Sequence, residues 1–570
     1  MKSHDHPKRA LLKLQSPLII QGKSLSPGLA QGMIHIHQSM LGPIDVPQHP
    51  GRKGRQRHDT EEELSHLDRA TATISDDLVV LAGRVEKEID ARLAAVFEAH
   101  QLMVNDAALR LELRKEITDN LVSASSAVKS VFLRWEKRFL LMESQIARDK
   151  GDDMRDLSIR LRNALVGITV HPLEGIPKDC VLVTSRLLPS DTIFLATQSV
   201  SAALLEFGSV GSHAALFSRE IGLPAISGLV NLFDVVSEGT LALVDAENGS
   251  VTLRPSSHQT QLFQEKADRQ AEVLQAARKH AQRPAVTKDG VAISVLANVG
   301  GHKDTENAIS NGAEGIGLYR IEQIYLGRVV PPDKEELVHE IRETLAPAKG
   351  HRVNIRLLDI GADKPLPFLG FLAESNPALG RRGIRLLNEY PELLKTQLKA
   401  VIDLCKEFDI QVLIPMVTLP EDVLVVKNML RQLGAKRPAT SLPKLGAMIE
   451  TPAAALSARE ISRHVDFLSF GTNDLTQYAF AADRENAAVE NYFNDAAQVI
   501  FRLMKITHDD VPDVPLSLCG ELAGRPEHIP LILQCGIRTL SVAAPLIPRI
   551  KEAIRGSNCE PEVQSLPENL

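Results

Sequence analysis

The sequence predicts an α/β protein in which a small α/β unit carrying an inserted helical bundle precedes a closed barrel of eight strands. Three observations support this prediction. Apolar runs recur eight times after residue 285, residues 60–166 contain no proline, and further short apolar runs lie on both sides of that stretch. At about 150 residues per domain, a chain of 570 residues has room for two to four domains.

The eight apolar runs of the C-terminal half are the expected strands of a (β/α)8 TIM barrel. Helical segments separate most of them, and eight such repeats in about 280 residues match the size of this fold. Such barrels carry their chemistry at the carboxyl ends of the strands. The runs are Ala292–Ala297, Gly315–Tyr319, Val353–Leu358, Val412–Met416, Leu445–Ile449, Phe467–Phe470, Leu516–Leu518 and Leu540–Ala543.

The helical bundle is expected over residues 59–166 as three or four charged helices. Thr60-x-x-Glu63 predicts a capping box at the start of the first helix, and Gly83 predicts a break. Residues 17–58 and 167–257 supply the α/β domain, with strands around Val181–Val183, Ala202–Leu205 and Leu241–Val244. Residues 258–284 lack proline before Pro284 and predict a linker helix, which leaves residues 285–570 for the barrel.

The composition excludes several classes of protein. Lys and Arg number 65 against 72 Asp and Glu, a balance that argues against a general nucleic-acid binder. No apolar run reaches the length of a membrane span. The five cysteines form no C-x-x-C pair, which is typical of a reducing compartment. A cytoplasmic protein without membrane or nucleic-acid partners is therefore expected.

Residues that follow the barrel strands have the chemistry of an anion and metal site. The arginine fork suits phosphate and carboxylate, and carboxylate oxygens suit Mg²⁺, so this rim implies a small, highly anionic substrate. Any one of these residues could instead belong to a surface ion pair, and Cys519 could be a small buried residue rather than a proton donor or nucleophile. The set comprises Asn298, Arg320, Arg356, Asp359, Arg382, Glu450, Asn473, Asp474, Arg484 and Cys519.

A second candidate site lies in the α/β domain. The segment Gly208-Ser-Val-Gly-Ser-His213 is a glycine-rich turn before an apolar helix, with Ser212 as its expected N-cap. His213 on the first helical turn can carry a phosphoryl group, because free backbone N–H groups there stabilise anions. A capping or structural histidine remains the alternative at this point.

Five blocks of the sequence make the chain similar to a known family. They read Asn311-Gly-Ala-Glu-Gly-Ile-Gly-Leu-Tyr-Arg320, Asp359-Ile-Gly-Ala-Asp-Lys364, Glu450-Thr-Pro-Ala-Ala-Ala455, Gly471-Thr-Asn-Asp-Leu-Thr-Gln-Tyr478 and Cys519-Gly-Glu-Leu-Ala-Gly524. Over residues 17–555 the chain resembles enzyme I of the phosphoenolpyruvate (PEP)-dependent sugar phosphotransferase system, the PEP–protein phosphotransferases.

This resemblance implies a role for each candidate residue. His213 would take the phosphoryl group of PEP and pass it to a histidine of an HPr-type phosphocarrier, with Cys519 protonating the enolate carbon to give pyruvate. Glu450 and Asp474 would hold Mg²⁺. The substrate-binding residues would be Arg320, Arg356, Arg382, Asn473, Asp474 and Arg484.

The resemblance also implies how the parts work together. The phosphohistidine α/β domain would swivel, with hinges near Pro255 and Pro284, and the helical insertion would dock the carrier. Homodimerisation through the barrel is expected. The carrier and the sugar or regulatory pathway downstream are not identified by the sequence.

Three departures from the family pattern concern uncharged positions. Gly211 and Ile321 stand where the family usually has threonine, and Ala362 stands where it has glycine. Every charged catalytic position remains, so an active enzyme is expected. The alternative is a regulatory or scaffolding relative that binds PEP or an HPr-like partner with little turnover.

Overall fold

The computed structural model describes most of the chain and divides it into two compact units. The described residues are 16–37, 57–88, 91–140, 145–168, 175–188, 199–208, 213–326, 328–361, 376–435, 442–484 and 489–560, with isolated positions between 173 and 195 and between 366 and 374. The units are Met1–Arg269 and Gln270–Leu570. Their boundary falls within helix α10 (Ser257–Lys279).

The first unit contains an eight-stranded mixed sheet of order β1-β8-β7-β3-β4-β5-β6-β2. The neighbours from β3 to β6 are parallel, whereas β1, β2, β7 and β8 join by antiparallel pairings. The strands are β1 (Leu18–Gln21), β2 (Lys23–Ser26), β3 (Leu29–His37), β4 (Cys180–Thr184), β5 (Val200–Leu205), β6 (Ala225–Ser227), β7 (Leu241–Asp245) and β8 (Ser250–Leu253). The strands expected in this region are confirmed.

The central strands are buried on both faces, which explains their continuous apolar runs. Along β4, Val181 and Val183 belong to one hydrophobic cluster, while Leu182 belongs to the cluster on the opposite face. This alternation is the period of a strand covered on both sides. Two short helices accompany the sheet, α8 (His213–Glu220) and α9 (Leu232–Val235).

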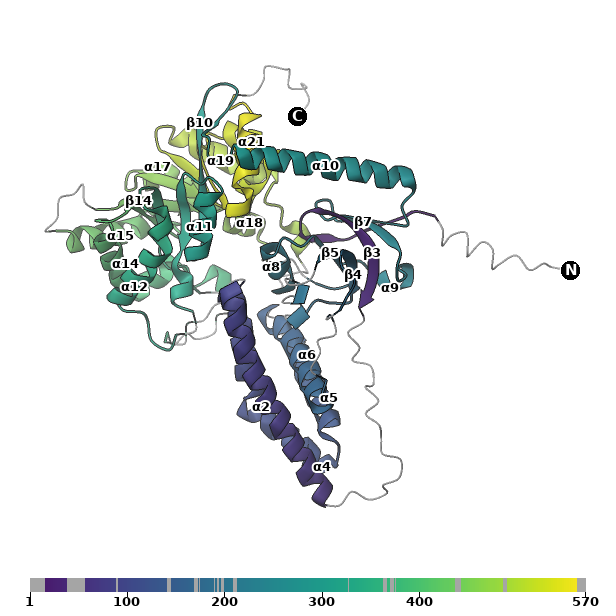
Figure 1. The fold of residues 1–570 in the computed structure, drawn as a ribbon. Helices are drawn as coiled ribbons and strands as arrows, with labels where there is room; N and C mark the ends of the chain where they lie inside the picture. Colours follow the sequence, from purple (N-terminus) through teal and green to yellow (C-terminus); the bar gives the residue numbers. More distant parts are fainter. Residues whose placement is uncertain are drawn as a thin grey trace. The chain divides into compact units, whose positions relative to one another are not determined.

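The helical part of this unit has five described helices, not three or four. They are α2 (Arg57–Glu88), α3 (Ala91–Val104), α4 (Ala107–Asn120), α5 (Ala124–Leu140) and α6 (Gln145–Leu165), of which α2, α5 and α6 run alongside one another (Figure 1). The expected break at Gly83 is wrong, because Gly83 lies inside α2. The real breaks use other signals, since the Asp106 side chain caps α4 and Leu121 adopts a left-handed conformation after it.

The expected capping box at Thr60 is also wrong. Helix α2 begins at Arg57, so Thr60 lies within its first turn. The Glu63 carboxylate instead accepts the backbone N–H of Ala124 at 2.8 Å, and Ala124 is the first residue of α5. A motif that looked local therefore serves the start of a different helix.

The second unit contains a closed parallel barrel of eight strands, as expected. The barrel closes because β10 pairs with both β11 and β17, and β9 (Ala285–Val286) adds an antiparallel pair to β10. The strands are β10 (Ala292–Val299), β11 (Gly315–Arg320), β12 (Arg352–Arg356), β13 (Asp409–Ile414), β14 (Lys444–Ile449), β15 (Phe467–Phe470), β16 (Leu516–Leu518) and β17 (Thr539–Ala543).

The outer helices of the barrel bury an apolar face against the strands. Leu394, Leu398 and Val401 of α14, for example, are buried and recur at helical spacing. The helices are α11 (His302–Ser310), α12 (Lys334–Leu345), α13 (Ile384–Glu389), α14 (Pro391–Leu404), α15 (Pro420–Leu433), α16 (Pro452–Leu456), α17 (Ala458–Ser462), α18 (Thr472–Phe480), α19 (Gln498–Asp510), α20 (Ile529–Gln534) and α21 (Ile547–Arg555). Three-ten turns η1 (Ile321–Ile324), η2 (Ala346–Ala348), η3 (Pro377–Leu379), η5 (Glu490–Tyr492), η6 (Glu521–Gly524), η7 (Pro526–His528) and η8 (Ala544–Leu546) complete it.

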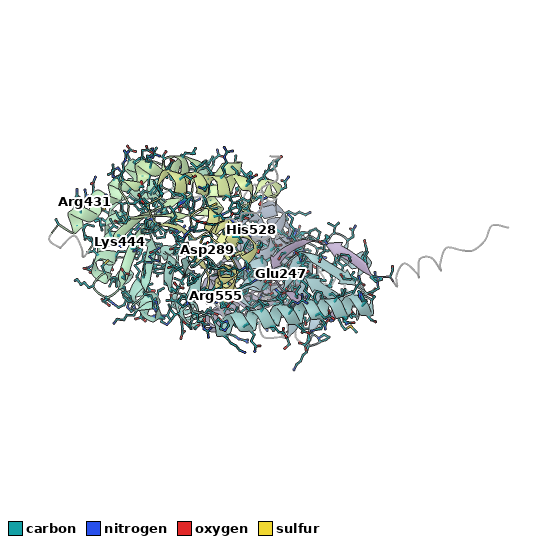
Figure 2. The ribbon with its side chains drawn as sticks, turned by 90° about the horizontal axis from the view of Figure 1, so that it is seen from above. Glu247, Asp289, Arg431, Lys444, His528 and Arg555 are labelled. Carbon is teal, nitrogen blue, oxygen red and sulfur yellow. The ribbon has the colours of Figure 1, made fainter. Side chains whose placement is uncertain are left out.

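The linker helix α10 ends at Lys279, five residues before the proline expected to end it. Two side chains of α21 hold the chain beyond it. Lys551 Nζ donates to Ala281 O at 3.0 Å, and Arg555, labelled in Figure 2, donates to His280 O at 3.0 Å. These cations bind the backbone carbonyls after the helix terminus, so the turn forms before Pro284.

None of the described helices combines the length and the apolar character needed to span a membrane.

Candidate functional site

Three carboxylates gather at the carboxyl ends of the barrel strands. Asp359 follows β12, Glu450 comes directly after β14, and Asp474 lies in the first turn of α18 after β15. One oxygen from each carboxylate lies within 4.8 Å of the others. Because parallel strands end at the same rim, residues more than 100 positions apart in sequence form one cluster.

One arginine binds two of these carboxylates. Arg382 Nη2 donates to Asp359 Oδ2 at 2.9 Å, and Arg382 Nη1 donates to Asp474 Oδ1 at 2.9 Å. The same Nη1 lies 3.2 Å from the hydroxyl of Tyr478. Gly361 makes a β-bridge to Arg382, and this bridge brings the segment of Arg382 beside the chain that follows Asp359.

A second arginine, Arg356, is the last residue of β12, the strand that Asp359 follows. Arg356 Nη1 is 3.2 Å from Asp359 Oδ2, and its Nη2 donates to Glu322 Oε1 at 2.9 Å. Glu322 Oε1 also accepts the backbone N–H of Asp359 at 3.0 Å. Glu322 thus fixes both the arginine and the backbone of the carboxylate beside it.

Two carboxylates of the cluster, Asp359 and Glu450, have pKa values shifted in opposite directions. Burial alone would raise the pKa of Asp359, but the guanidinium groups of Arg356 and Arg382 outweigh it and lower the pKa to about 2. Glu450 is 1% exposed and accepts the backbone N–H of Met416 at 2.8 Å. Burial is the main cause that raises the pKa of Glu450, to about 8, and the negative charges of Asp474 and Asp359 add to it.

This donor set fits a hard divalent cation such as Mg²⁺. The three residues offer only oxygen ligands, and their crowding makes the charged form of Glu450 costly without a counter-charge. A divalent cation supplies that counter-charge, and arginines on the same rim suit an anionic ligand beside it.

Cys519 directly follows β16 and is buried in the barrel. Its Sγ lies 3.4 Å from Phe470 O and accepts from the Ser469 hydroxyl at 3.5 Å. Burial raises the pKa of the Cys519 thiol to about 11, so the thiol keeps its proton at neutral pH. Asn298 of β10 donates to Cys519 O at 3.1 Å, which positions the backbone of this residue.

The remaining predicted rim residues lie at the end of β11 and in or after α18. Arg320 is the last residue of β11 and is exposed. Arg484 follows α18, with its Nη1 3.9 Å from Asp474 Oδ1. Asn473 Oδ1 accepts the backbone N–H of Glu521 at 3.0 Å.

His213 belongs to the other unit and is the first residue of α8, after β5. Residues 209–212 of its glycine-rich turn, including Gly211, lie outside the described residues, as does Ala362 of the barrel. The predicted helix start at this histidine is observed.

One residue of the acidic cluster, Asp359, and one residue that holds it in place, Glu322, were absent from the predicted site. Asp359 was placed on the rim but given no role, and Glu322 was not singled out. A sequence signal was present for both, because Asp359 opens one block of the family resemblance and Glu322 lies two residues after another, and each follows a strand. That signal does not show which carboxylates lie close enough together to bind one cation.

Comparison with protein families covers nearly the whole chain. Residues 21–150 match the model described as "PEP-utilising enzyme, N-terminal". Residues 176–249 match "PEP-utilising enzyme, mobile domain", and residues 275–559 match "PEP-utilising enzyme, PEP-binding domain". The acidic cluster lies within the last of these segments, and His213 lies within the second.

Curated relatives are similar over most of their own length. A phosphoenolpyruvate-protein phosphotransferase of Mycoplasma pneumoniae is 34% identical over 84% of each chain. Proteins of the same name from Haloferax volcanii and Staphylococcus carnosus are 35% and 32% identical, over 85% and 90% of this chain and 86% and 90% of theirs. The chain therefore belongs to the family of phosphoenolpyruvate-protein phosphotransferases.

Proposed function

We propose that this chain transfers the phosphoryl group of PEP to its own His213 and then to a histidine of an HPr-type phosphocarrier, releasing pyruvate. In the first step the bond between phosphorus and the enol oxygen breaks and a bond from phosphorus to a His213 nitrogen forms. The enolate left behind gains a proton at carbon. The alternative of a scaffolding relative with little turnover is not favoured, because the similar proteins are named as transferases.

The acidic cluster with its flanking arginines is the observation that carries this proposal. Arg356 and Arg484 supply positive charge beside Asp359 and Asp474, and Arg320 ends the neighbouring strand β11. Such an arrangement binds the phosphate and carboxylate of PEP and offsets the charge that moves during transfer. Bound Mg²⁺ would be held by Glu450 and Asp474, with Asp359 beside them, and would neutralise part of that charge.

Cys519 is the proposed proton donor to the enolate carbon. A donor must hold its proton at working pH, and the raised pKa of this buried thiol meets that condition. After donation the thiolate regains a proton from water. Asn473 and Arg382 are proposed to orient the substrate. Arg382 would be available for this role once the cation also binds its carboxylate partners Asp359 and Asp474.

The remaining parts of the proposal concern assembly. The unit with His213 would bring this residue to the barrel rim and then to the carrier, with the helical insertion as the docking surface. We further propose that the protein is cytoplasmic and forms a homodimer through the barrel. Its reaction would be the first step of a phosphotransferase system for sugar transport.

Transfer of label from PEP tests the proposal. Radiolabelled PEP with Mg²⁺ should label the full-length protein at His213, and added HPr-type carrier should remove that label. His213→Gln should accept no label yet bind PEP with unchanged affinity, whereas His339→Gln, at an exposed position on helix α12, should behave like the unaltered protein. Label that persists in His213→Gln would overturn the assignment.

A further inference from the structure

Arg186 lies at the same edge of the sheet as the start of helix α8. Strand β4 ends at Thr184, which pairs with Leu205 at the end of β5. The pairing continues past both strands, because Phe207 N donates to Ser185 O at 3.0 Å. Phe207 lies six residues before His213 on the segment that leads from β5 into α8.

Among the described residues, two side chains contact the guanidinium of Arg186. Its Nη1 donates to both carboxylate oxygens of Asp152, at 3.1 and 3.2 Å, and its Cζ lies 5.2 Å from the centroid of the Phe207 ring. Within the described part of the chain, Nε and Nη2 donate to no atom, and the side chain is 33% exposed. Three N–H donors of a planar fork are therefore not used by the described residues.

The turn that carries Arg186 is fixed at both ends. The Thr184 hydroxyl donates to Arg186 O at 3.1 Å, and Asp191 Oδ2 accepts the backbone N–H of Leu188 at 2.9 Å. Further along, Asp156 of helix α6 accepts from both the hydroxyl and the backbone N–H of Ser190, at 2.6 and 3.0 Å. These hydrogen bonds fix the backbone of the turn and so restrict the position of the Arg186 side chain, as recognition of a small anion requires.

We propose that Arg186 binds the phosphoryl group while it is carried on His213. This inference rests on the proposed function, because it needs a phosphohistidine at the start of α8. A phosphohistidine adds a doubly charged group with three acceptor oxygens, and an arginine fork binds such a group through two parallel hydrogen bonds. Asp152 and Phe207 hold the guanidinium plane, and Nε and Nη2, which donate to no described residue, are the donors proposed for the phosphoryl oxygens.

Two consequences distinguish this role from a purely structural one. Binding to the charged phosphoryl group lowers the pKa of its last ionisation and favours the phosphorylated protein over PEP. A structural link between α6 and the sheet would affect thermal stability alone. It would also be lost equally when either Asp152 or Arg186 is replaced.

The test uses full-length Arg186→Gln, Arg186→Lys and Asp152→Asn, with Arg269→Gln, an exposed arginine on linker helix α10, as the control. The equilibrium of His213 phosphorylation is measured at set ratios of PEP to pyruvate, and ³¹P NMR follows the phosphohistidine across pH. We expect Arg186→Gln to need about a tenfold higher ratio of PEP to pyruvate, or ~1.4 kcal/mol. Its phosphoryl group should also titrate at higher pH.

The two remaining variants sharpen the result. Arg186→Lys keeps the charge without the fork and should recover part of the shift. Asp152→Asn keeps the arginine and should shift the equilibrium less than Arg186→Gln does. If His213 becomes labelled and Arg186→Gln matches the unaltered chain in both the phosphorylation equilibrium and the ³¹P titration, this inference alone is overturned. Absence of label on His213 in the unaltered chain would instead overturn the proposed function, and this inference with it.

Discussion

A β-carbon on Gly471 would lie 2.8 Å from both Cγ and Oε2 of Glu450. Gly471 has a backbone conformation that alanine can adopt, with φ −99° and ψ 80°, so the restriction is steric. The absence of a side chain at the end of β15 thus leaves the space that the Glu450 carboxylate occupies.

We predict that Gly471→Ala displaces this carboxylate and lowers Mg²⁺-dependent turnover at least tenfold without unfolding the barrel. The ring of strands does not depend on Glu450, which lies at a strand end. Turnover against Mg²⁺ concentration, with circular dichroism as a check on folding, measures the effect. Gly83→Ala is the matched control, because nothing lies within 4 Å of a β-carbon there. Unchanged Mg²⁺ dependence in Gly471→Ala would contradict the metal assignment of Glu450.

Asp359 is predicted to contribute to metal binding, although the sequence analysis gave it no specific role. Asp359→Asn removes one negative charge from the cluster and frees part of the Arg382 fork. We expect Mn²⁺, used as a paramagnetic substitute, to bind at least tenfold more weakly in a titration followed by electron spin resonance. Asp403→Asn on outer helix α14 is the control and should bind Mn²⁺ normally. Equal affinity in both variants would limit Asp359 to holding its arginines.

Cys519 is predicted to be unreactive at neutral pH and necessary for pyruvate formation. Its pKa of about 11 lies above the ordinary thiol value, so the protonated form persists until the pH rises through 11. At pH 8 an alkylating reagent should therefore modify Cys519 roughly a hundredfold more slowly than an ordinary thiol. The rate should rise tenfold per pH unit, and Cys519→Ala provides the background rate.

The kinetic counterpart separates a proton donor from a wall of the pocket. Cys519→Ala should lower kcat about a hundredfold while KM for PEP changes little, because proton donation belongs to the reaction and not to binding. A raised KM with unchanged kcat would show that the thiol only lines the site.

The barrel could be predicted from the sequence because its pattern repeats. Each apolar run is short, and most of them are followed by polar residues, as at Asp359 and Cys519, so eight weak signals support one another. The helical bundle offered no such repetition. Its breaks at Asp106 and Leu121 lack the glycine and proline that usually mark helix ends, so the number of helices was too low.

The site could be predicted as a set of residue types but not as a set of partners. The sequence places Glu322, Asp359 and Arg356 near strand ends, whereas only the three-dimensional register shows that Glu322 binds both the arginine side chain and the aspartate backbone. Likewise, nothing in the sequence links Arg186 with Asp152, which come together through the packing of α6 near the end of β4.

The last prediction concerns where the chain bends between its two units. Lys551 is 1% exposed, and its ammonium donates to Ala281 O and Arg283 O at 3.0 and 3.3 Å. Arg555 adds hydrogen bonds to the carbonyls of Arg283 and Pro284, at 2.8 and 3.4 Å. Of the two hinges expected from the prolines, the one near Pro284 is thus tied to α21.

We therefore expect the bend at the other end of α10, near Pro255. Lys551→Met should leave the carbonyl of buried Ala281 without this donor, at a cost of ~1–3 kcal/mol, and lower Tm by a few degrees, whereas Arg283 O keeps its hydrogen bond from Arg555. Amide hydrogen exchange over residues 280–285 should accelerate in this variant. Lys505→Met, which removes a lysine paired with Asp509 on the surface of α19, should change neither quantity. In the unaltered protein, amides around Pro255 should exchange faster than those at 280–285, because only the latter segment is held by α21. Slower exchange at Pro255 than at 280–285 would place the bend at the barrel end of the helix instead.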